Sequence, residues 1–492
     1  MSTVNVTVSA KGDLAYRNTG DEHLEFFSKA GAMFVGKSKR QAYYYKNDTA
    51  DILDMFKSAW HCDYEVAMKL LFWLRDCRGG AGNRSGFRKI VTWLADKHPE
   101  WVISNLQFIP ELGRWDDFVA LVGTECEVDA LDFWVDSITS GNALAAKWAP
   151  RAKRNKDLFN KMRKVAGMGP AEWRKLLAET TNVVETAMCQ GDWYSIEYAH
   201  VPSVAMARSR NAFEKHDSVR FSKWAEGLAS GETTVNASVL FPHDCIRTLR
   251  AESGCNMNSL YYGSRGDYVD SLVANGQFDS LPNYMEDSGE RIMPICDFSG
   301  SMCIQIAGSV EAIDVSMALG LYCSDRVGKD NPFYRKFVPF STDSALVDWK
   351  NETFSIAAQK YMNGYCGTTD IARALGKILD AAKFFNATDE QIPSMLLILS
   401  DMQFDCACRG GKNAVDTALD KWVEAGYTKP RIIFWDLVAY GTAPATKSTE
   451  NVAMVSGFSP SLLKAILDGD DFSPMAVMHR ALEKYNYIVV PD

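Results

Sequence analysis

Apolar residues recur at helical spacings through the first part of the chain, from about residue 50 to residue 285. In the clearest stretch they lie three, four or seven residues apart, as on one face of an amphipathic helix. This stretch contains Ala59, Trp60, Val66, Ala67, Leu70, Leu71 and Leu74. Similar patterns predict short helices at residues 87–94, 101–106 and 115–122, and residues 78–82 form a glycine-rich break. Short helices joined by tight turns predict an α-helical module with HEAT-like repeats.

The pattern changes after about residue 285, where short apolar runs alternate with helical stretches. The runs predict strands at residues 292–296, 333–340, 395–399, 432–438 and 487–490. The helical stretches are residues 310–325, 371–385, 415–425, 462–467 and 476–485. Continuous apolar strands between helices predict a parallel, doubly wound α/β sheet covered on both faces.

The chain is therefore expected to be a multidomain protein that combines an α module with an α/β domain. The helical module should cover residues 1–285, with residues 1–20 as an extended N-terminal arm. The α/β domain should cover residues 286–492. The length of 492 residues agrees with two or three domains.

The composition predicts a chain that folds into large hydrophobic cores, since 47% of the residues are hydrophobic. No apolar run approaches the roughly 18 residues that cross a bilayer, and the first residues lack the apolar segment of a signal peptide. We therefore expect a cytoplasmic protein with no membrane partner. The twelve cysteines are scattered without a Cys-x-x-Cys pair, which favours reduced thiols over a zinc site.

Charge is distributed unevenly along the chain, whose net charge is −9. Residues 1–285 carry 34 basic and 35 acidic side chains, whereas residues 286–492 carry 19 and 27. The acidity therefore belongs to the C-terminal part, and the balanced N-terminal part contains local basic clusters.

A set of oxygen-bearing side chains follows the predicted strands of the α/β domain. Ligands bind at the carboxyl ends of the strands in a doubly wound sheet, and carboxylates with hydroxyls are hard ligands suited to Mg²⁺, with Mn²⁺ or Ca²⁺ possible. One group follows the strand at 292–296 in a D-x-S-x-S pattern, a threonine precedes the helix at 371–385, and an aspartate ends the strand at 395–399. The predicted ligands are Asp297, Ser299, Ser301, Thr369 and Asp401, with Thr368 as the alternative to Thr369.

This set resembles the metal-ion-dependent adhesion site of von Willebrand factor A domains, written D-x-S-x-S…T…D. The resemblance implies a Rossmann-like A domain whose metal leaves one coordination position to water or to a carboxylate from a partner. The alternative is a capped helix start in which Asp297 and Ser299 only form a turn. No nucleophile–base pair accompanies the site, and His479 lies far along the chain, so we do not expect an enzyme.

The strongest basic cluster lies between residues 147 and 175, where ten basic side chains face only Asp157 and Glu172. On a helical scaffold such a strip can neutralise several phosphates and release counterions. Trp148, Phe159 and Trp173 interleave with the charges and either stack on bases or pack in the core. The basic residues are Lys147, Arg151, Lys153, Arg154, Lys156, Lys161, Arg163, Lys164, Arg174 and Lys175.

Two further clusters lie upstream. Arg78, Arg84 and Arg88 surround the glycine-rich break, which is not a P-loop because no G-K-[ST] follows it. Flexible glycines beside arginines suit phosphate contact, but an ordinary helix–helix turn explains them equally well. The other cluster spans residues 37–46. Solvated surface charge is the alternative for each cluster, whereas three together favour a nucleic acid recognised by shape or as a single strand.

Several segments resemble a known arrangement in which a helical-repeat module precedes an A-type domain. This architecture is that of the Ro autoantigen family with its telomerase–Ro–vault (TROVE) module, and a related viral, bacterial and plant family of unknown function is closer. In Ro-like ribonucleoproteins the repeats form a ring that receives single-stranded RNA ends, and structured small RNAs bind its basic surface. The resemblance implies RNA binding and a ring closed by the A domain. It is carried by residues 72–82, 109–117, 147–150 and 456–460.

We therefore expect a non-catalytic, Ro-like RNA-binding scaffold with a divalent-metal adhesion site. The first alternative is a protein–protein adaptor, for example a partner of a MoxR-type AAA+ ATPase that offers an acidic side chain to the metal. A single-stranded-DNA-binding protein is a further alternative, because a sequence-blind groove would accept either polymer. A metal-dependent hydrolase is the least supported, since no base accompanies the site.

Overall fold

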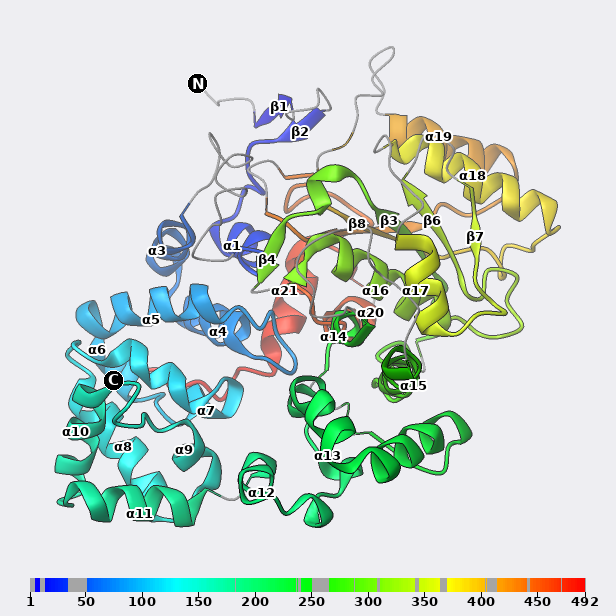
Figure 1. Ribbon diagram of the computed structural model, residues 1–492. Helices are drawn as coiled ribbons and strands as arrows, with labels where there is room; N and C mark the ends of the chain where they lie inside the picture. Colours follow the sequence, from blue (N-terminus) through cyan, green and yellow to red (C-terminus); the bar gives the residue numbers. More distant parts are fainter. Residues whose placement is uncertain are drawn as a thin grey trace.

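The structure, a computed structural model, describes residues 5–8, 14–33, 51–181, 183–235, 237, 240–249, 265–286, 288–307, 310–340, 345–362, 370–402, 404, 414–439, 443–469 and 471–491. The first half is helical and the second half contains a sheet with helices around it (Figure 1). None of the helices in these ranges has the length and the apolar composition that crossing a bilayer requires.

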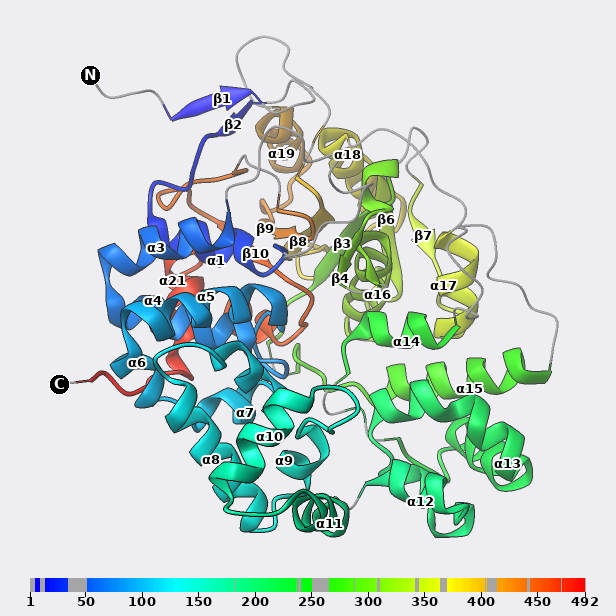
Figure 2. The same cartoon turned by 60° about the vertical axis from the view of Figure 1, so that its left-hand side comes forward.

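Two short strands and a helix begin the described part of the chain. They are β1 (Val6–Val8), β2 (Leu14–Tyr16) and α1 (Glu22–Ala30). The helices of the first half then follow one another in a curved row (Figure 2). They are α3 (Ile52–Cys62), α4 (Tyr64–Arg75), α5 (Arg84–Lys97), α6 (Pro99–Ile103), α7 (Phe108–Leu112), η1 (Trp115–Leu121), α8 (Glu127–Thr139), α9 (Ala143–Trp148), α10 (Lys156–Val165), α11 (Pro170–Thr180), α12 (Val184–Gln190), η2 (Trp193–Ser195), η3 (Tyr198–His200), α13 (Ser203–Ser230), α14 (Pro242–Leu249) and α15 (Arg265–Asp279).

The predicted single helix over residues 59–74 is wrong, because the chain breaks there into α3 and α4. Asp63 takes an extended conformation between them, and its carboxylate accepts hydrogen bonds from the backbone N–H groups of Glu65 and Val66. An aspartate in this position caps the new helix, so its local bonding outweighs the continuous apolar pattern.

The second half forms a six-stranded sheet in the order β10-β9-β8-β3-β6-β7. Its strands are β3 (Ile292–Asp297), β6 (Lys336–Phe340), β7 (Val347–Asp348), β8 (Met395–Ser400), β9 (Arg431–Asp436) and β10 (Val452–Ser456). In sequence order within this sheet the pattern is 6-5-4-1-2-3, the doubly wound arrangement. The fully parallel sheet that we expected is a mixed one, because the edge strand β7 runs antiparallel to β6.

Helices and short elements connect and cover these strands. They are η4 (Gly300–Met302), β4 (Gln305–Ala307), β5 (Val310–Glu311), α16 (Ala312–Asp325), α17 (Phe354–Met362), α18 (Ile371–Phe384), α19 (Ala414–Glu424), α20 (Leu462–Leu467) and α21 (Pro474–Glu483). The predicted strand at residues 487–490 is wrong. Those residues leave the sheet, and the side chain of Asn105 exchanges two 2.8 Å hydrogen bonds with the backbone of Val489. Because the Asn105 amide already bonds to the N–H and C=O groups of Val489, these groups need no partner strand in the sheet.

The beginning of the chain packs against the last strand of the sheet. Helix α1 lies against β10, where the Ser456 hydroxyl donates to the Phe27 carbonyl at 2.9 Å and accepts from the Gly31 N–H at 3.0 Å. A side chain at Gly31 would clash, since its Cβ would lie 2.5 Å from the Ser456 carbonyl oxygen. Helix α1 is thus part of the covering of the α/β half.

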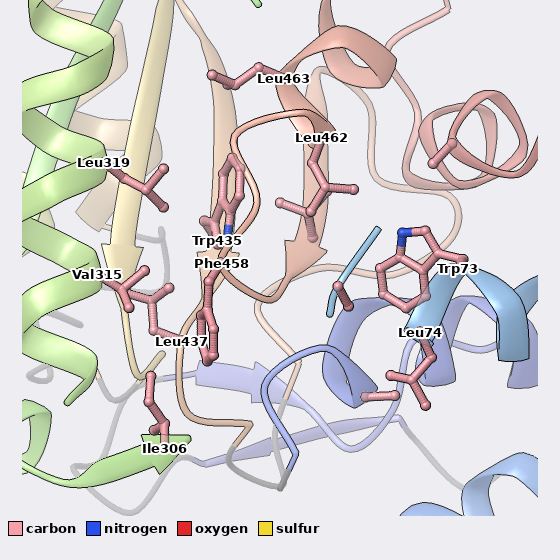
Figure 3. Packing of buried hydrophobic residues seen from close by; sticks show 14 of the residues in the cluster. Trp73, Leu74, Ile306, Val315, Leu319, Trp435, Leu437, Phe458, Leu462 and Leu463 are labelled. Carbon is pink, nitrogen blue, oxygen red and sulfur yellow. The ribbon is translucent and has the colours of Figure 1, made fainter. Parts of the chain in front are cut away.

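The row of helices returns to the α/β half at its other end, where α14 packs on α16 and α15 on α17 (Figures 1 and 2). Before α14, Phe241 lies against Gly82, and His243 packs edge-on against Phe458 at 5.7 Å. Both ends of the helical row therefore contact the sheet-containing half. A ring closed by an A-type domain stays a prediction. One hydrophobic cluster runs through both halves and includes Trp73, Trp435 and Leu462 (Figure 3).

Candidate functional site

The predicted metal ligands follow two neighbouring strands at the centre of the sheet. Strand β3 ends at Asp297 and β8 ends at Ser400, and these strands pair in parallel with Cys296 opposite Leu399. The strand order reverses between β3 and β8, since the chain continues from β3 to β6 on one side and later to β8 on the other. Ligands of doubly wound sheets bind at this reversal, outside the carboxyl ends of the strands.

Asp297 is held rigidly by the residues around it. It is fully buried, its Oδ1 accepts the Ser299 N–H at 2.8 Å, and its Oδ2 accepts the Ser400 hydroxyl at 2.7 Å. These bonds orient the carboxylate at the strand end, as outer-shell partners do for metal ligands. Asp401 follows Ser400 directly and is also fully buried.

The two predicted hydroxyl ligands lie beside each other in the turn after β3. The Oγ atoms of Ser299 and Ser301 are 2.9 Å apart, and Ser299 is nearly buried. Thr369 and the alternative Thr368 lie outside the described residues. The described donors are hard oxygen atoms, the kind that Mg²⁺ prefers. Among the described residues, no group of three or more His, Cys, Asp or Glu side chains is placed to hold a metal ion. The residues also form turn hydrogen bonds, so the capped-turn interpretation stays open.

Asp436 is a third buried carboxylate at this edge, which the sequence analysis did not single out. It pairs in register with Ser400, and its Oδ1 accepts the N–H groups of Val438 and Ala439 at 2.9 and 2.7 Å. Burial raises the pKa of Asp436 to about 6, although these N–H groups and Lys29 oppose the shift. A signal for it was present in the sequence, since it ends an apolar strand as Asp401 does.

We call the ten basic side chains between Lys147 and Lys175 the basic strip. They lie on α9, on α10, on the first part of α11 and on the loop between α9 and α10. Three of them form ion pairs: Lys147 with Glu185 at 2.9 Å, Lys161 with Glu127, and Lys175 with Glu179 at 3.7 Å. The other seven have no acidic partner among the described residues; they are Arg151, Lys153, Arg154, Lys156, Arg163, Lys164 and Arg174.

Arg151 differs from its neighbours because it is partly buried. Its Nη2 donates a long 3.3 Å hydrogen bond to the Thr181 hydroxyl, and its Nη1 is buried without a hydrogen-bond partner in the described part of the chain. Burial lowers the pKa of Arg151 from its usual value. A desolvated guanidinium without a carboxylate is a place where an incoming anion would lower the free energy.

The arginines of the glycine-rich break have structural partners instead. Asp117 is fully buried and contacts the guanidinium groups of Arg75, Arg84 and Arg88 at 2.7, 3.2 and 2.8 Å. Arg114 binds the neighbouring Asp116 at 2.6 Å. Four guanidinium groups around two carboxylates leave an excess of two positive charges. These pairs account for Arg84 and Arg88 without a ligand, and phosphate contact by them stays a prediction.

The third arginine of that cluster, Arg78, is exposed and donates a 2.7 Å hydrogen bond to the Glu111 carbonyl. The cluster at residues 37–46 lies outside the described residues. Of the interleaved aromatics, Phe159 and Trp173 are buried in the core, whereas Trp148 is only half-buried. Core packing therefore explains the first two.

Trp148 joins two of the predicted basic clusters. The guanidinium carbon of Arg114 lies 3.8 Å from the centre of the Trp148 ring, and the Lys147 ammonium lies 5.9 Å from it. Arg114 of the arginine–aspartate network and Lys147 of the basic strip therefore both lie against the Trp148 ring. Arg114 was not among the predicted residues, because its contact with Trp148 forms only when η1 packs on α9.

Comparison with known proteins gives matches over nearly the whole chain. Residues 291–486 match the profile of a family described as a domain of unknown function, DUF7788, and residues 9–127 and 170–290 match another, DUF2828. The chain is 25% identical to an uncharacterised protein, L728, of Acanthamoeba polyphaga mimivirus, over 98% of this chain and 88% of that protein. These matches agree with the expected resemblance to a family of unknown function.

Among solved structures, the chain is similar to the Ro (RSR) protein of Deinococcus radiodurans. The TM-score is 0.49 at 13% sequence identity, and the superposition covers 94% of this chain and 99% of that chain. A similarity of this degree supports no conclusion on its own.

Proposed function

We propose that this chain is a non-catalytic nucleic-acid-binding scaffold that holds RNA, single-stranded or folded into a small structure, along the basic strip. The observation that carries the proposal is the set of seven basic side chains without an acidic partner in the described ranges, next to the Arg114–Trp148 stack. Unpaired cations in a row attract a phosphate backbone, and binding releases its counterions. The strip offers charge without an array of base-reading side chains, which suits recognition by shape or as a single strand.

RNA is favoured over DNA by the architecture of a helical-repeat module followed by an A-type domain, which resembles that of the Ro autoantigen family. The guanidinium of Arg151 is partly buried without a carboxylate partner among the described residues, so its charge adds a physical reason to place a phosphate beside this part of the strip. Three cations follow closely in the same loop and the start of α10, namely Lys153, Arg154 and Lys156.

The test is fluorescence anisotropy with labelled single-stranded RNA, an RNA hairpin and single-stranded DNA. The test variant carries Arg151→Glu, Lys153→Glu and Arg154→Glu. The control carries Lys329→Glu, Lys383→Glu and Lys464→Glu, three exposed lysines of the α/β half, so both variants change the net charge equally. The proposal requires weaker RNA binding by at least tenfold in the first variant only. Equal affinities for wild type and both variants, or no binding by wild type at low salt, would refute it.

A second function is favoured by the acidic edge of the sheet. We propose that Asp297, Ser299, Ser301, Thr369 and Asp401 hold Mg²⁺ in the manner of a von Willebrand A-type adhesion site. The metal would supply one open position for a carboxylate from a partner protein, and the Ser400–Asp297 hydrogen bond at 2.7 Å would keep the ligand oriented. This adaptor role concerns the other half of the molecule and is compatible with RNA on the strip. The strip variants should leave it unchanged.

A further inference from the structure

Tyr194 is the most exposed large hydrophobic residue in the described part of the chain. It lies in η2, directly after α12, and 84% of its surface is accessible. Val219 of α13 is 80% exposed as well. Single exposed apolar side chains are common on protein surfaces, so exposure alone assigns no role to this tyrosine.

The Tyr194 ring is supported from one side by a fixed cation. The guanidinium carbon of Arg220 lies 4.8 Å from the ring centre. Arg220 is itself anchored, because it donates to the Trp193 carbonyl at 3.0 Å and to the Ile196 carbonyl at 2.7 Å and pairs with Asp217 at 2.9 Å. One face of the tyrosine is thus backed by a cation, and high exposure leaves the other face open to solvent.

Other aromatic and basic side chains lie on the neighbouring residue of η2 and on α13. Trp193 stacks on His216 with ring centres 4.6 Å apart and an angle of 5° between the planes. Lys215 and Lys223 lie on the same helix as His216, are exposed, and form no ion pair with any described residue. Aromatic rings combined with cations are what proteins use to hold unpaired bases and their phosphates.

Helix α12 connects this region to the basic strip along the chain. Lys147 of the strip pairs with Glu185 in the first turn of α12 at 2.9 Å, and η2 follows that helix after two residues. A helix of seven residues is about 10 Å long, which is a distance that two or three nucleotides of an extended strand can span. Figure 2 shows α12 between α11 and α13 in the row of helices.

We infer that Tyr194 is a stacking platform for an unpaired nucleobase of a single strand whose phosphates lie on the basic strip. The inference rests on the proposed nucleic-acid binding and narrows it to single strands at this end of the strip. A base in a duplex is already stacked on its neighbours and does not present its face, so the platform distinguishes the two forms. Stacking on an aromatic ring is tolerant of base identity, which agrees with the absence of base-reading side chains in the strip.

The experiment compares Tyr194→Ala and Tyr194→Phe with wild type, using a labelled 12-nucleotide oligouridine and a 12-base-pair RNA duplex. Tyr194→Ala should weaken oligouridine binding about tenfold and leave duplex binding unchanged, while Tyr194→Phe keeps the wild-type affinity for both. An oligouridine carrying one 2-aminopurine should lose fluorescence on wild type and keep it on Tyr194→Ala. Equal melting temperatures of the variants would show that folding is unaffected.

Failure of the inference is distinguishable from failure of the proposed function. The stacking role is overturned if Tyr194→Ala binds oligouridine as tightly as wild type does, or if its affinities for the duplex and for the single strand fall equally. In that case the triple charge reversal at residues 151, 153 and 154 would still weaken the binding of both oligouridine and the duplex. If that reversal has no effect either, the basic strip itself is not the binding surface.

Discussion

The Tyr485 hydroxyl donates a 2.9 Å hydrogen bond to the Asp76 carboxylate, which lies 409 residues earlier in the chain. Tyr485 follows the last helix of the α/β half, and Asp76 ends α4 of the helical half, and both are buried. Burial alone would raise the pKa of Asp76, but Lys484 and the N–H groups of Arg78 and Gly79 outweigh burial and hold it below its usual value. The C-terminus is therefore fastened to the helical half by a buried, ionised acceptor.

Tyr485→Phe should lower the free energy of unfolding by about 1–2 kcal/mol, because it removes one hydrogen bond to a buried charged group. Urea unfolding followed by tryptophan fluorescence measures the change. Tyr487→Phe is the matched control, since Tyr487 is 43% exposed and its contact is a ring contact with Phe108 at 4.7 Å that the substitution preserves. Equal unfolding midpoints for the two variants would contradict the role assigned to Tyr485.

Asp117→Asn should destabilise the protein more strongly, by about 3 kcal/mol. Asp117 is fully buried among Arg75, Arg84 and Arg88, so its neutralisation leaves three guanidinium groups close together without their shared carboxylate. Asp132→Asn on the exposed surface of α8 is the control and should change stability by less than about 0.5 kcal/mol. Thermal unfolding of the three proteins checks this, and a small loss for Asp117→Asn would show that the network is dispensable.

His243 should make stability depend on pH. Burial between Phe241 and Phe458 lowers the pKa of His243 below its usual value of 6.5, with Asp244 opposing the shift and Arg247 adding to it. In the unfolded chain His243 therefore binds a proton more readily than in the folded protein. As a result, the free energy of unfolding falls as the pH drops below 6.5. The loss should approach about 1.4 kcal/mol per pH unit.

The change His243→Phe keeps an aromatic ring in this position and removes the titrating group. The melting temperature of wild type should therefore fall more than that of His243→Phe when the pH is lowered from 7.5 to 5.5. His61→Phe on the exposed surface should behave like wild type. The prediction is wrong if His243→Phe and wild type lose melting temperature in parallel over this range.

Magnesium should stabilise the protein through the acidic edge of the sheet. Ligand that binds only the folded state raises its stability by about 2.7 kcal/mol at a hundred times the dissociation constant. We expect Mg²⁺ to raise the melting temperature of wild type and to leave that of Asp297→Asn unchanged. Asparagine preserves the side-chain volume beside Ser400, and Asp380→Asn in α18 is the control for a lost carboxylate. No metal-dependent shift in wild type would count against the predicted ligand set.

Much of the α/β half could be predicted because its strands are buried on both faces. Strands β3 and β8 are continuous apolar runs, and their carboxyl ends carry the predicted oxygen ligands. Strand β10 was not predicted, although all five of its residues are buried. The strand predicted at residues 487–490 has the right composition, but the amide of Asn105 satisfies its backbone, and that partner lies far away in sequence.

The basic clusters show where sequence reasoning reaches its limit. Counting charges in the sequence located the basic strip. The structure shows that seven of its cations have no acidic partner among the described residues. Counting could not foresee that Arg84 and Arg88 share Asp117, which is about thirty residues away. It also gave no reason to notice Tyr194, because the exposure of a single aromatic residue depends on packing around it.

The salt dependence of RNA affinity tests the central claim most directly. For a single strand each neutralised phosphate contributes about 0.7 to the slope of log affinity against log salt, so seven unpaired cations set a limit of about −5 for wild type. The combined change Arg151→Ala, Lys153→Ala and Arg154→Ala should reduce the magnitude of that slope by about 2. A wild-type affinity independent of salt, or a slope that the combined change leaves as it was, would contradict binding along the strip.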